Sequence, residues 1–167
     1  CEMALALINA KIITPFRIIR EGTLLIEDNN ISELGYREDV AVPESSEIID
    51  CRGRSVCPGF VDLLVHCALG YGFSDGTHDD FKTISDYFLK NGSTTMLASL
   101  YAKPEDQLLQ NVRNLADYIL AHPESNIRGI HMEGPYLNKA FKGAMNESWL
   151  WTPTVESWNK MWEASRG

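Results

Sequence analysis

The sequence predicts a mixed α/β protein in which a β-rich segment is followed by alternating strands and amphipathic helices. Residues 4–50 carry short apolar runs separated by turn-forming residues, the pattern of a small sheet. Farther along, apolar runs at 56–66 and 94–100 have the near-continuous hydrophobicity of strands buried on both faces, and a shorter run leads to Glu133. Helical patterns stand between these runs, so we expect parallel strands joined by right-handed crossovers.

The β-rich start divides into short strands where turn chemistry interrupts it. Asn9-Ala10-Lys11 and Glu21-Gly22 are two such interruptions, and Asp28-Asn29-Asn30 is a third. We expect this module to have little core of its own. The expected strands are 5–8, 12–13, 17–19, 23–26, 31–35 and 48–51.

The helices are predicted from apolar residues that recur every three or four positions. The first spans 79–90, with Asn91-Gly92 as its C-cap. The second opens at Pro104, because proline is tolerated in a first helical turn. The last follows Thr154 and is expected to place three apolar residues on one side, as core or interface: Val155, Trp158 and Trp162.

Two parts are expected along the chain, a β-module at 1–55 and an alternating β/α series at 56–167. The series ends with a helix that has no strand after it, and a closed (β/α)8 barrel needs about 250 residues. We therefore expect this chain to be the front part of a larger protein.

Composition and charge exclude some classes of partner. The 167 residues carry a net charge of −8, with no run of consecutive lysines and arginines. Nucleic acids and anionic membrane surfaces need clustered cations, so neither is expected as a partner. No apolar run approaches the ~20 residues of a membrane span. The four cysteines include no C-x-x-C pair, which favours reduced thiols and a cytoplasmic protein.

Glu133 is the first candidate for chemistry. It lies at the end of a short strand that Gly134-Pro135 terminates, and α/β folds keep their functional groups at the carboxyl ends of strands. His131 precedes it by two positions, so both side chains are expected on one face. The alternative is a structural carboxylate held by an arginine or by backbone N–H groups.

His66 is the second candidate, because it follows the first of the strands expected to be buried. Imidazole and carboxylate are normal ligands of a divalent ion such as zinc. Such an ion with an open position makes a bound water acidic enough to act as hydroxide near neutral pH. A single histidine at a strand end is also commonly a hydrogen-bonded structural residue, so both roles stay open.

Three motifs carry a resemblance to a known family. They are Pro58-Gly59-Phe60-Val61-Asp62 leading to His66, then His131-Met132-Glu133-Gly134-Pro135-Tyr136-Leu137, and then Lys142-Gly143-Ala144. In this order the chain resembles the amidohydrolase superfamily and, within it, the N-acetylglucosamine-6-phosphate deacetylase family. The resemblance covers the whole chain, and the second and third motifs are its most specific part.

The resemblance implies both a fold and an activity. The fold is a (β/α)8 TIM barrel of the amidohydrolase type, of which this chain holds the first three βα units, preceded by part of a small β-sandwich that strands from the far C-terminus complete. The activity is removal of acetate from N-acetylglucosamine 6-phosphate in amino-sugar catabolism. Because a neighbouring subunit takes part in phosphate binding in the family, a homodimer is also implied.

The resemblance further assigns roles to residues of this chain. Glu133 is implied as the principal metal ligand, for zinc or iron, and Ala144 and Met145 as lining the sugar site. Two further histidine ligands and an aspartate that acts as general acid/base lie beyond residue 167. No catalytic residue is therefore expected within this chain, which alone should be inactive and should lack a tight metal site.

Two positions depart from the family's pattern. Leu64 stands where the family usually has the first histidine of an H-x-H motif, and Met145 stands where it has a histidine after K-G-A. Leucine cannot bind a metal, and a thioether cannot give a sugar hydroxyl the hydrogen bonds of an imidazole. Two alternatives therefore stay open: a non-catalytic sugar-phosphate-binding relative, and an amidohydrolase that acts on another acylated or cyclic amide.

Overall fold

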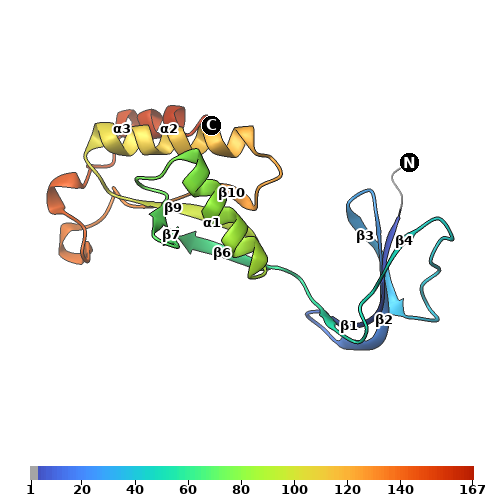
Figure 1. Cartoon of the computed structure of the whole chain (residues 1–167). Coiled ribbons are helices and arrows are strands. Elements are labelled where there is room, and N and C mark those ends of the chain that lie inside the picture. The colour runs from blue at the N-terminus through green and yellow to red at the C-terminus, as the bar shows by residue number, and fades with distance from the viewer. Residues whose placement is uncertain (1–3) are drawn as a thin grey trace. The chain divides into compact units, whose positions relative to one another are not determined.

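The computed structural model describes residues 4–167, and the chain divides between Pro58 and Gly59 into two compact units (Figure 1). This division falls a few residues beyond the domain boundary expected after residue 55. Each unit has buried hydrophobic clusters of its own.

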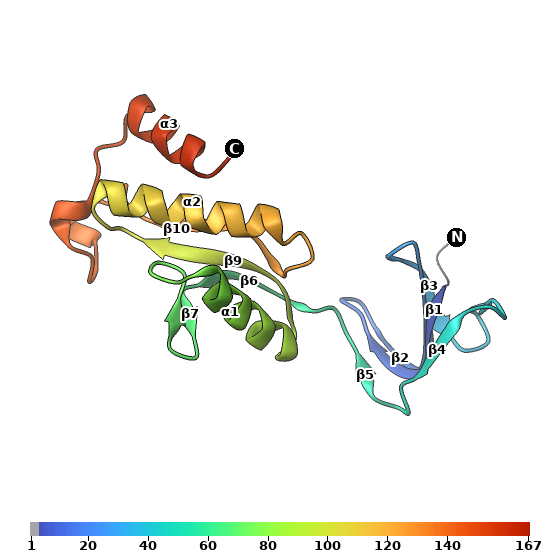
Figure 2. The same ribbon diagram turned by 45° about the horizontal axis from the view of Figure 1, so that its top comes forward.

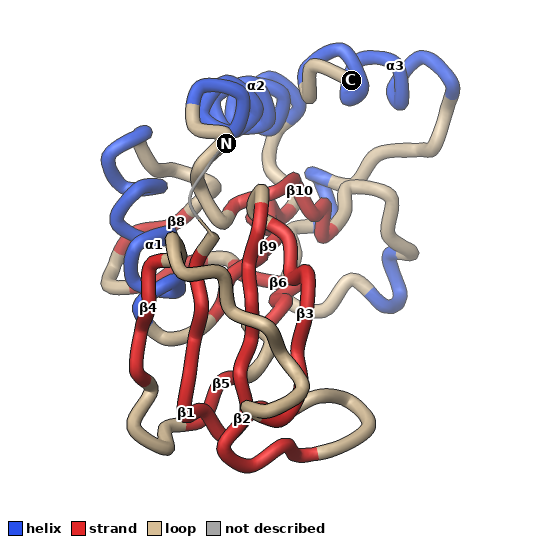
Figure 3. The backbone as a smooth tube through the Cα atoms, turned by 90° about the vertical axis from the view of Figure 1, so that its right-hand side faces the viewer, coloured by secondary structure: helices blue, strands red, loops and turns tan. Residues whose placement is uncertain are grey.

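The first unit is a five-stranded sheet with the order β3-β2-β1-β4, in which β5 also pairs with β1 (Figure 3). Strand β1 pairs antiparallel with β2 and parallel with β4 and β5, and β2 pairs antiparallel with β3. The strands are β1 Leu5–Ile13, β2 Ile18–Glu27, β3 Asn30–Tyr36, β4 Glu47–Asp50 and β5 Ser55–Val56.

Two of the predicted turns in this unit are wrong. The chain continues as a single strand through Asn9 and again through Glu21, and both residues adopt a φ of +53° within the strand. The pairing of β1 with β2 shifts register on both sides of Ala10. Turn-forming residues here produce β-bulges, because the hydrogen bonds of the neighbouring strand hold the chain in the sheet.

The hydrophobic core of the first unit is small, as predicted. One buried cluster contains Ala10, Ile12, Ile19 and Leu24. A second contains Ala6, Leu25 and Val40.

The second unit contains a parallel three-stranded sheet with the order β10-β9-β6 (Figure 2). Its strands are β6 Phe60–Val65, β9 Ser93–Tyr101 and β10 Ile127–Glu133, and a small hairpin pairs β7 Cys67–Ala68 with β8 Tyr71–Gly72. Its helices are α1 His78–Lys90, α2 Glu105–Ala121 and α3 Val155–Ala164, with 3-10 turns at Lys139–Phe141 and Glu147–Trp149.

Helices α1 and α2 cover the sheet with the apolar stripes that their sequences predict. Thr77 caps α1 through a reciprocal capping box with Asp80. Buried side chains of both helices pack in one cluster with those of β9, the central strand. This cluster includes Phe81, Ile84, Met96, Ala98, Leu100, Leu108, Val112 and Leu115.

Strand β6 differs from the prediction, and in helix α3 the two tryptophans are not part of the core. The apolar run of β6 is not buried on both faces, because β6 pairs only with β9 among the described strands and lies at an edge of the sheet. Phe60, Val61 and Leu63 are exposed. In α3 the buried residues are Met161 and Ala164, whereas Val155, Trp158 and Trp162 are exposed and the two indoles stack on each other.

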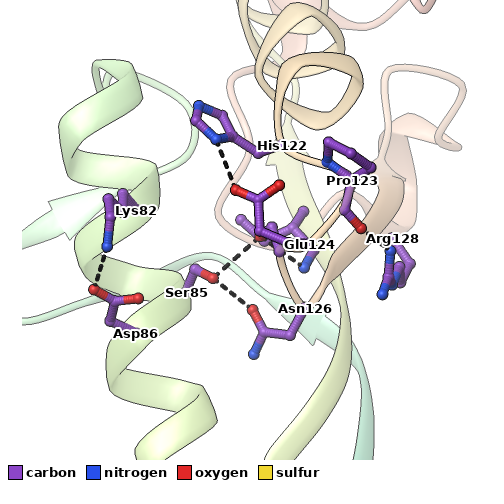
Figure 4. Close-up of polar contacts among 10 residues, drawn as sticks. Lys82, Ser85, Asp86, His122, Pro123, Glu124, Asn126 and Arg128 are labelled. Carbon is purple, nitrogen blue, oxygen red and sulfur yellow. Dashed lines mark hydrogen bonds and ion pairs between the residues drawn. The ribbon is translucent and has the colours of Figure 1, made fainter. Parts of the chain in front are cut away.

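A buried polar cluster joins α1 to the start of β10 (Figure 4). Ser85 Oγ donates a hydrogen bond to Asn126 Oδ1 at 2.7 Å and lies 3.1 Å from Ser125 Oγ. Asn126 Nδ2 in turn donates to the backbone carbonyl of Ser93 at the start of β9. These bonds satisfy polar groups that would otherwise be buried without partners, and they fix the helix over the sheet.

No helix in residues 4–167 is both long enough and apolar enough to cross a membrane. The cysteines in this part of the chain, Cys51, Cys57 and Cys67, are free thiols.

Candidate functional site

The parallel strands of the second unit end at a common edge, and a cavity of about 510 Å³ lies there. The cavity contains all four residues that the sequence proposed for the site. They are His66, Glu133, Ala144 and Met145.

His66 and Glu133 are in direct contact, with 2.9 Å between His66 Nε2 and Glu133 Oε2. The other imidazole nitrogen, Nδ1, lies 3.1 Å from the backbone carbonyl of Ser99. A carbonyl oxygen can only accept, so Nδ1 carries a hydrogen and a neutral ring presents a lone pair at Nε2. This Nε2 lone pair and the Glu133 carboxylate oxygen face each other, which is the arrangement in which one cation binds both atoms.

The sheet order explains why these two residues meet. Val65 of β6 is paired with Ala98 of β9, and Glu133 of β10 is paired with Tyr101 of β9. His66 directly follows Val65, so the imidazole and the carboxylate approach each other from the two strands that flank β9.

The environment of His131 differs from that of Glu133. Its Nδ1 lies 3.1 Å from Ser99 Oγ, and it is not among the residues that line the cavity. Ser99 is fully buried and contacts both histidines: its carbonyl contacts His66, and its hydroxyl contacts His131. The arginine or backbone N–H partner considered for Glu133 is not found among the hydrogen bonds of the described chain; its partner is His66.

The segment 142–146 forms one wall of the cavity. Lys142 Nζ donates a hydrogen bond to the carbonyl of Met145 at 2.8 Å, which closes this segment into a turn. A Cβ on Gly134 would come within 3.4 Å of Met145 Sδ, so the thioether lies over the backbone next to Glu133. Leu64 is exposed and is not part of the cavity lining.

Tyr101, Ala102 and Trp149 also line the cavity, although none of them was predicted from the sequence. A signal was available for Tyr101, because it ends a buried strand as Glu133 does. Trp149 lies in a 3-10 turn, and no pattern in the sequence predicts that it reaches this cavity.

Lys103 lies near two aromatic residues of the cavity, Tyr101 and Trp149. Its Nζ lies 4.9 Å from the centre of the Tyr101 ring, 6.0 Å from that of Trp149 and 3.3 Å from Asp75 Oδ1. Burial lowers the pKa of Lys103, but its contacts with Tyr101 and Asp75 outweigh burial and raise the pKa above its ordinary value. Lys103 is therefore a charged group that holds two aromatic rings of the cavity in place.

The donor chemistry of the His66–Glu133 pair suits a divalent metal, since an imidazole nitrogen and a carboxylate oxygen face the same point. Across residues 4–167, however, no three His, Cys, Asp or Glu side chains are grouped closely enough to hold an ion. The pair therefore presents two donor atoms, whereas a structural zinc site has four ligands.

Fold and site together define a mixed α/β protein with an imidazole–carboxylate pair in a cavity at the carboxyl edge of a parallel sheet. The known proteins that it resembles over most of its length are N-acetylglucosamine-6-phosphate deacetylases, which are hydrolases. No family model matches the chain.

Among curated relatives, the deacetylase of Haemophilus influenzae is 26% identical over 160 residues, which is 92% of this chain and 40% of the relative. The deacetylase of Bacillus subtilis is also 26% identical, over 93% of this chain and 40% of its own length. This chain thus spans about 40% of the length of the curated relatives that it matches.

Solved structures give the same result. A mutant of the Mycobacterium smegmatis deacetylase in complex with N-acetyl-D-glucosamine-6-phosphate matches with a TM-score of 0.80 and 28% identity, over 98% of this chain and 41% of that one. The deacetylase of Pasteurella multocida matches with a TM-score of 0.82 and 26% identity, over 98% of this chain and 42% of that one. The fold corresponds to the N-terminal part of these enzymes.

Proposed function

We propose that the complete protein is a metal-dependent amide hydrolase that removes acetate from N-acetylglucosamine 6-phosphate. The observation that carries this proposal is the 2.9 Å contact between His66 and Glu133 inside the cavity at the strand ends. The names of the relatives support the choice of substrate, and one of their structures is a complex with N-acetyl-D-glucosamine-6-phosphate.

In this proposal the second unit is the first part of an amidohydrolase-type TIM barrel, with three βα units, and residues 1–55 are part of a β-sandwich. The parallel order β10-β9-β6 supports the barrel, because barrel strands are parallel and joined through helices. The cavity at their carboxyl ends lies where barrels hold their active sites.

Glu133 is proposed as the principal metal ligand and His66 as a second, with zinc or iron as the ion. Such an ion, when bound, polarises the acetamide carbonyl and makes a water acidic enough to attack it. The carbonyl of Ser99 fixes the tautomer of His66 and so directs the Nε2 lone pair toward the site. The remaining ligands and the aspartate that acts as general acid/base are proposed to come from beyond residue 167.

Substrate binding is proposed to use the other walls of the cavity. Ala144 and Met145 contact the sugar, and the rings of Tyr101 and Trp149 offer apolar faces against which a pyranose packs. We further propose a cytoplasmic homodimer with no nucleic-acid or membrane partner, in keeping with the acidic net charge of −8.

The proposal is tested with the full-length protein by measuring acetate release and bound metal. Glu133→Gln keeps the size of the side chain but removes its charge, and it should abolish both the metal content and the activity. Glu147→Gln is the matched control, because Glu147 pairs with Lys139 at the surface and does not line the cavity. Full activity in the Glu133→Gln protein would refute the assignment.

A non-catalytic sugar-phosphate-binding protein is the second candidate, and the thioether of Met145 in the cavity wall favours it. It predicts that the full-length protein binds N-acetylglucosamine 6-phosphate without releasing acetate. The same thioether is compatible with hydrolysis of another acylated or cyclic amide. A panel of such amides, assayed beside the amino sugar, separates the three functions.

A further inference from the structure

The first unit carries a cavity of its own, of about 570 Å³, whose walls are rich in cations. Lys11 lies on β1, Arg20 on β2, Arg37 after β3 and Arg52 between β4 and β5. Residues 4–58 contain few other cations, so most of the positive charge of this unit faces a single cavity. The other two are Arg17 and Arg54.

These cations do not have carboxylate partners. Among the described residues none of the four forms an ion pair, whereas Lys82, Lys160 and Arg166 of the second unit each pair with an acidic side chain. Unpaired guanidinium groups grouped on one concave surface repel one another, so an anion bound between them lowers their electrostatic energy.

Of the two carboxylates in this cavity, Asp50 already has partners. It accepts hydrogen bonds from Asn9 Nδ2 at 3.0 Å and from the backbone N–H of Arg52 at 2.9 Å. The other carboxylate, Glu21, lies in the bulge of β2. Two carboxylates against four cations leave the cavity positive, within a chain whose net charge is −8.

The backbone shapes the cavity at the positions that bear these side chains. Asn9, Glu21 and Arg52 are non-glycine residues with φ between +51° and +53°, and all three line the cavity. Such a backbone persists only where the surrounding structure holds it. Asn9 precedes Lys11 by two positions, Glu21 directly follows Arg20, and Arg52 is itself a cation of the cavity, so these backbone positions lie at or beside three of the four cations.

We propose that this cavity binds a compact phosphate-bearing small molecule, with the arginine side chains as its main ligands. Guanidinium groups form paired hydrogen bonds that match the oxygens of a phosphate. The volume is that of an ordinary small-molecule site. Because the rest of the chain is acidic, a compact anion fits this site and an extended polyanion does not. This inference does not depend on the proposed deacetylase function.

The test is a titration of the chain with pyrophosphate, inorganic phosphate and sulfate, followed by calorimetry and by amide chemical shifts. Pyrophosphate should bind at least about tenfold more tightly than sulfate, because it offers more oxygens to the guanidinium groups. Its largest shifts should fall on the amides of Asn9, Glu21, Arg52 and Gly53.

Two matched double variants decide whether the cavity is the site. Arg20→Gln with Arg37→Gln should weaken pyrophosphate binding by about tenfold or more. Arg17→Gln with Arg54→Gln removes the same charge from the same unit outside the cavity and should change binding by less than about twofold. Equal losses in the two proteins, equal affinities for sulfate and pyrophosphate, or shifts confined to other residues would each overturn the proposal, as would the absence of binding.

Discussion

His66 Nε2 lies 2.9 Å from Glu133 Oε2, although His66 directly follows strand β6 and Glu133 is the last residue of strand β10. Strand β9 separates these strands in the sheet, and its Ser99 carbonyl holds the imidazole in the orientation that makes the contact. The pair therefore depends on the register of three strands.

The first prediction concerns metal retention by the complete protein. His66→Asn should lower metal affinity by at least about 10- to 100-fold, the loss that removal of an outer-shell partner already causes, because it removes the Nε2 donor itself but leaves Glu133 in place. Elemental analysis after dialysis measures this loss. His122→Asn, which changes a histidine paired with Glu124 away from the cavity, should leave the metal content unchanged. Unchanged metal in the His66→Asn protein would show that its imidazole is structural.

The second prediction concerns substrate affinity. Met145→His replaces a thioether in the cavity wall by a hydrogen-bonding group. It should lower KM for N-acetylglucosamine 6-phosphate by about fivefold, since one additional hydrogen bond is worth about 1 kcal/mol. Met145→Leu, similar in volume and equally apolar, should leave KM close to its original value. A similar KM in all three proteins would contradict a polar contact at this position.

The third prediction concerns the core of the second unit. Leu100 is fully buried in β9, whereas Leu120 of α2 is 67% exposed. Leu100→Ala should lower the free energy of unfolding by about 2–5 kcal/mol, because it leaves a cavity between the sheet and its helices. Leu120→Ala should change it by less than about 0.5 kcal/mol. Urea denaturation curves compare the two, and equal midpoints would be inconsistent with the packing described.

The fourth prediction concerns the polar cluster in Figure 4. Ser85→Ala removes the donor to Asn126 Oδ1 and should destabilise the protein by about 1–3 kcal/mol, the cost of a buried polar atom without a partner. Ser45→Ala, at an exposed loop position, serves as the control and should have little effect. Thermal unfolding monitored by circular dichroism gives both values. A neutral Ser85→Ala would mean that water replaces the lost hydroxyl.

The fifth prediction concerns the protonation of Asp50. The backbone N–H of Arg52 and then the side chain of Asn9 lower the pKa of Asp50 below its ordinary value of 3.8. The free energy of unfolding that these contacts contribute is therefore fully present when the pH is above the ordinary pKa of 3.8. It is lost as the pH falls through the lower pKa of the folded state. Carboxyl chemical shifts followed against pH measure it, and Asn9→Ala should move the pKa upward. No movement would indicate that the Asn9 contact is absent in solution.

Periodic patterns in the sequence were sufficient to predict much of the fold. The buried residues Phe81 and Ile84 of α1 and Leu108, Val112 and Leu115 of α2 recur at the spacing of three or four positions from which both helices were predicted, because this spacing reports which side of a helix meets a sheet. The strand positions of β9 and β10 follow from similarly local information.

Other features depend on distant partners and could not be read from local patterns. Asn9 and Glu21 form β-bulges and not turns, because hydrogen bonds to the neighbouring strand hold the chain in the sheet. The exposure of β6 depends on which strands flank it. His66 and Glu133 were each predicted from a strand end, but the link through Ser99 was not, since serine within a strand carries no signal of its own.

The central position of β9 has a consequence for motion. In the complete protein, a cation shared by His66 and Glu133 would cross-link β6 and β10 without using any hydrogen bond of β9, the strand between them. Chelation would then loosen β6 and β10 first, and deuterium would enter their amides well before it reached those of β9.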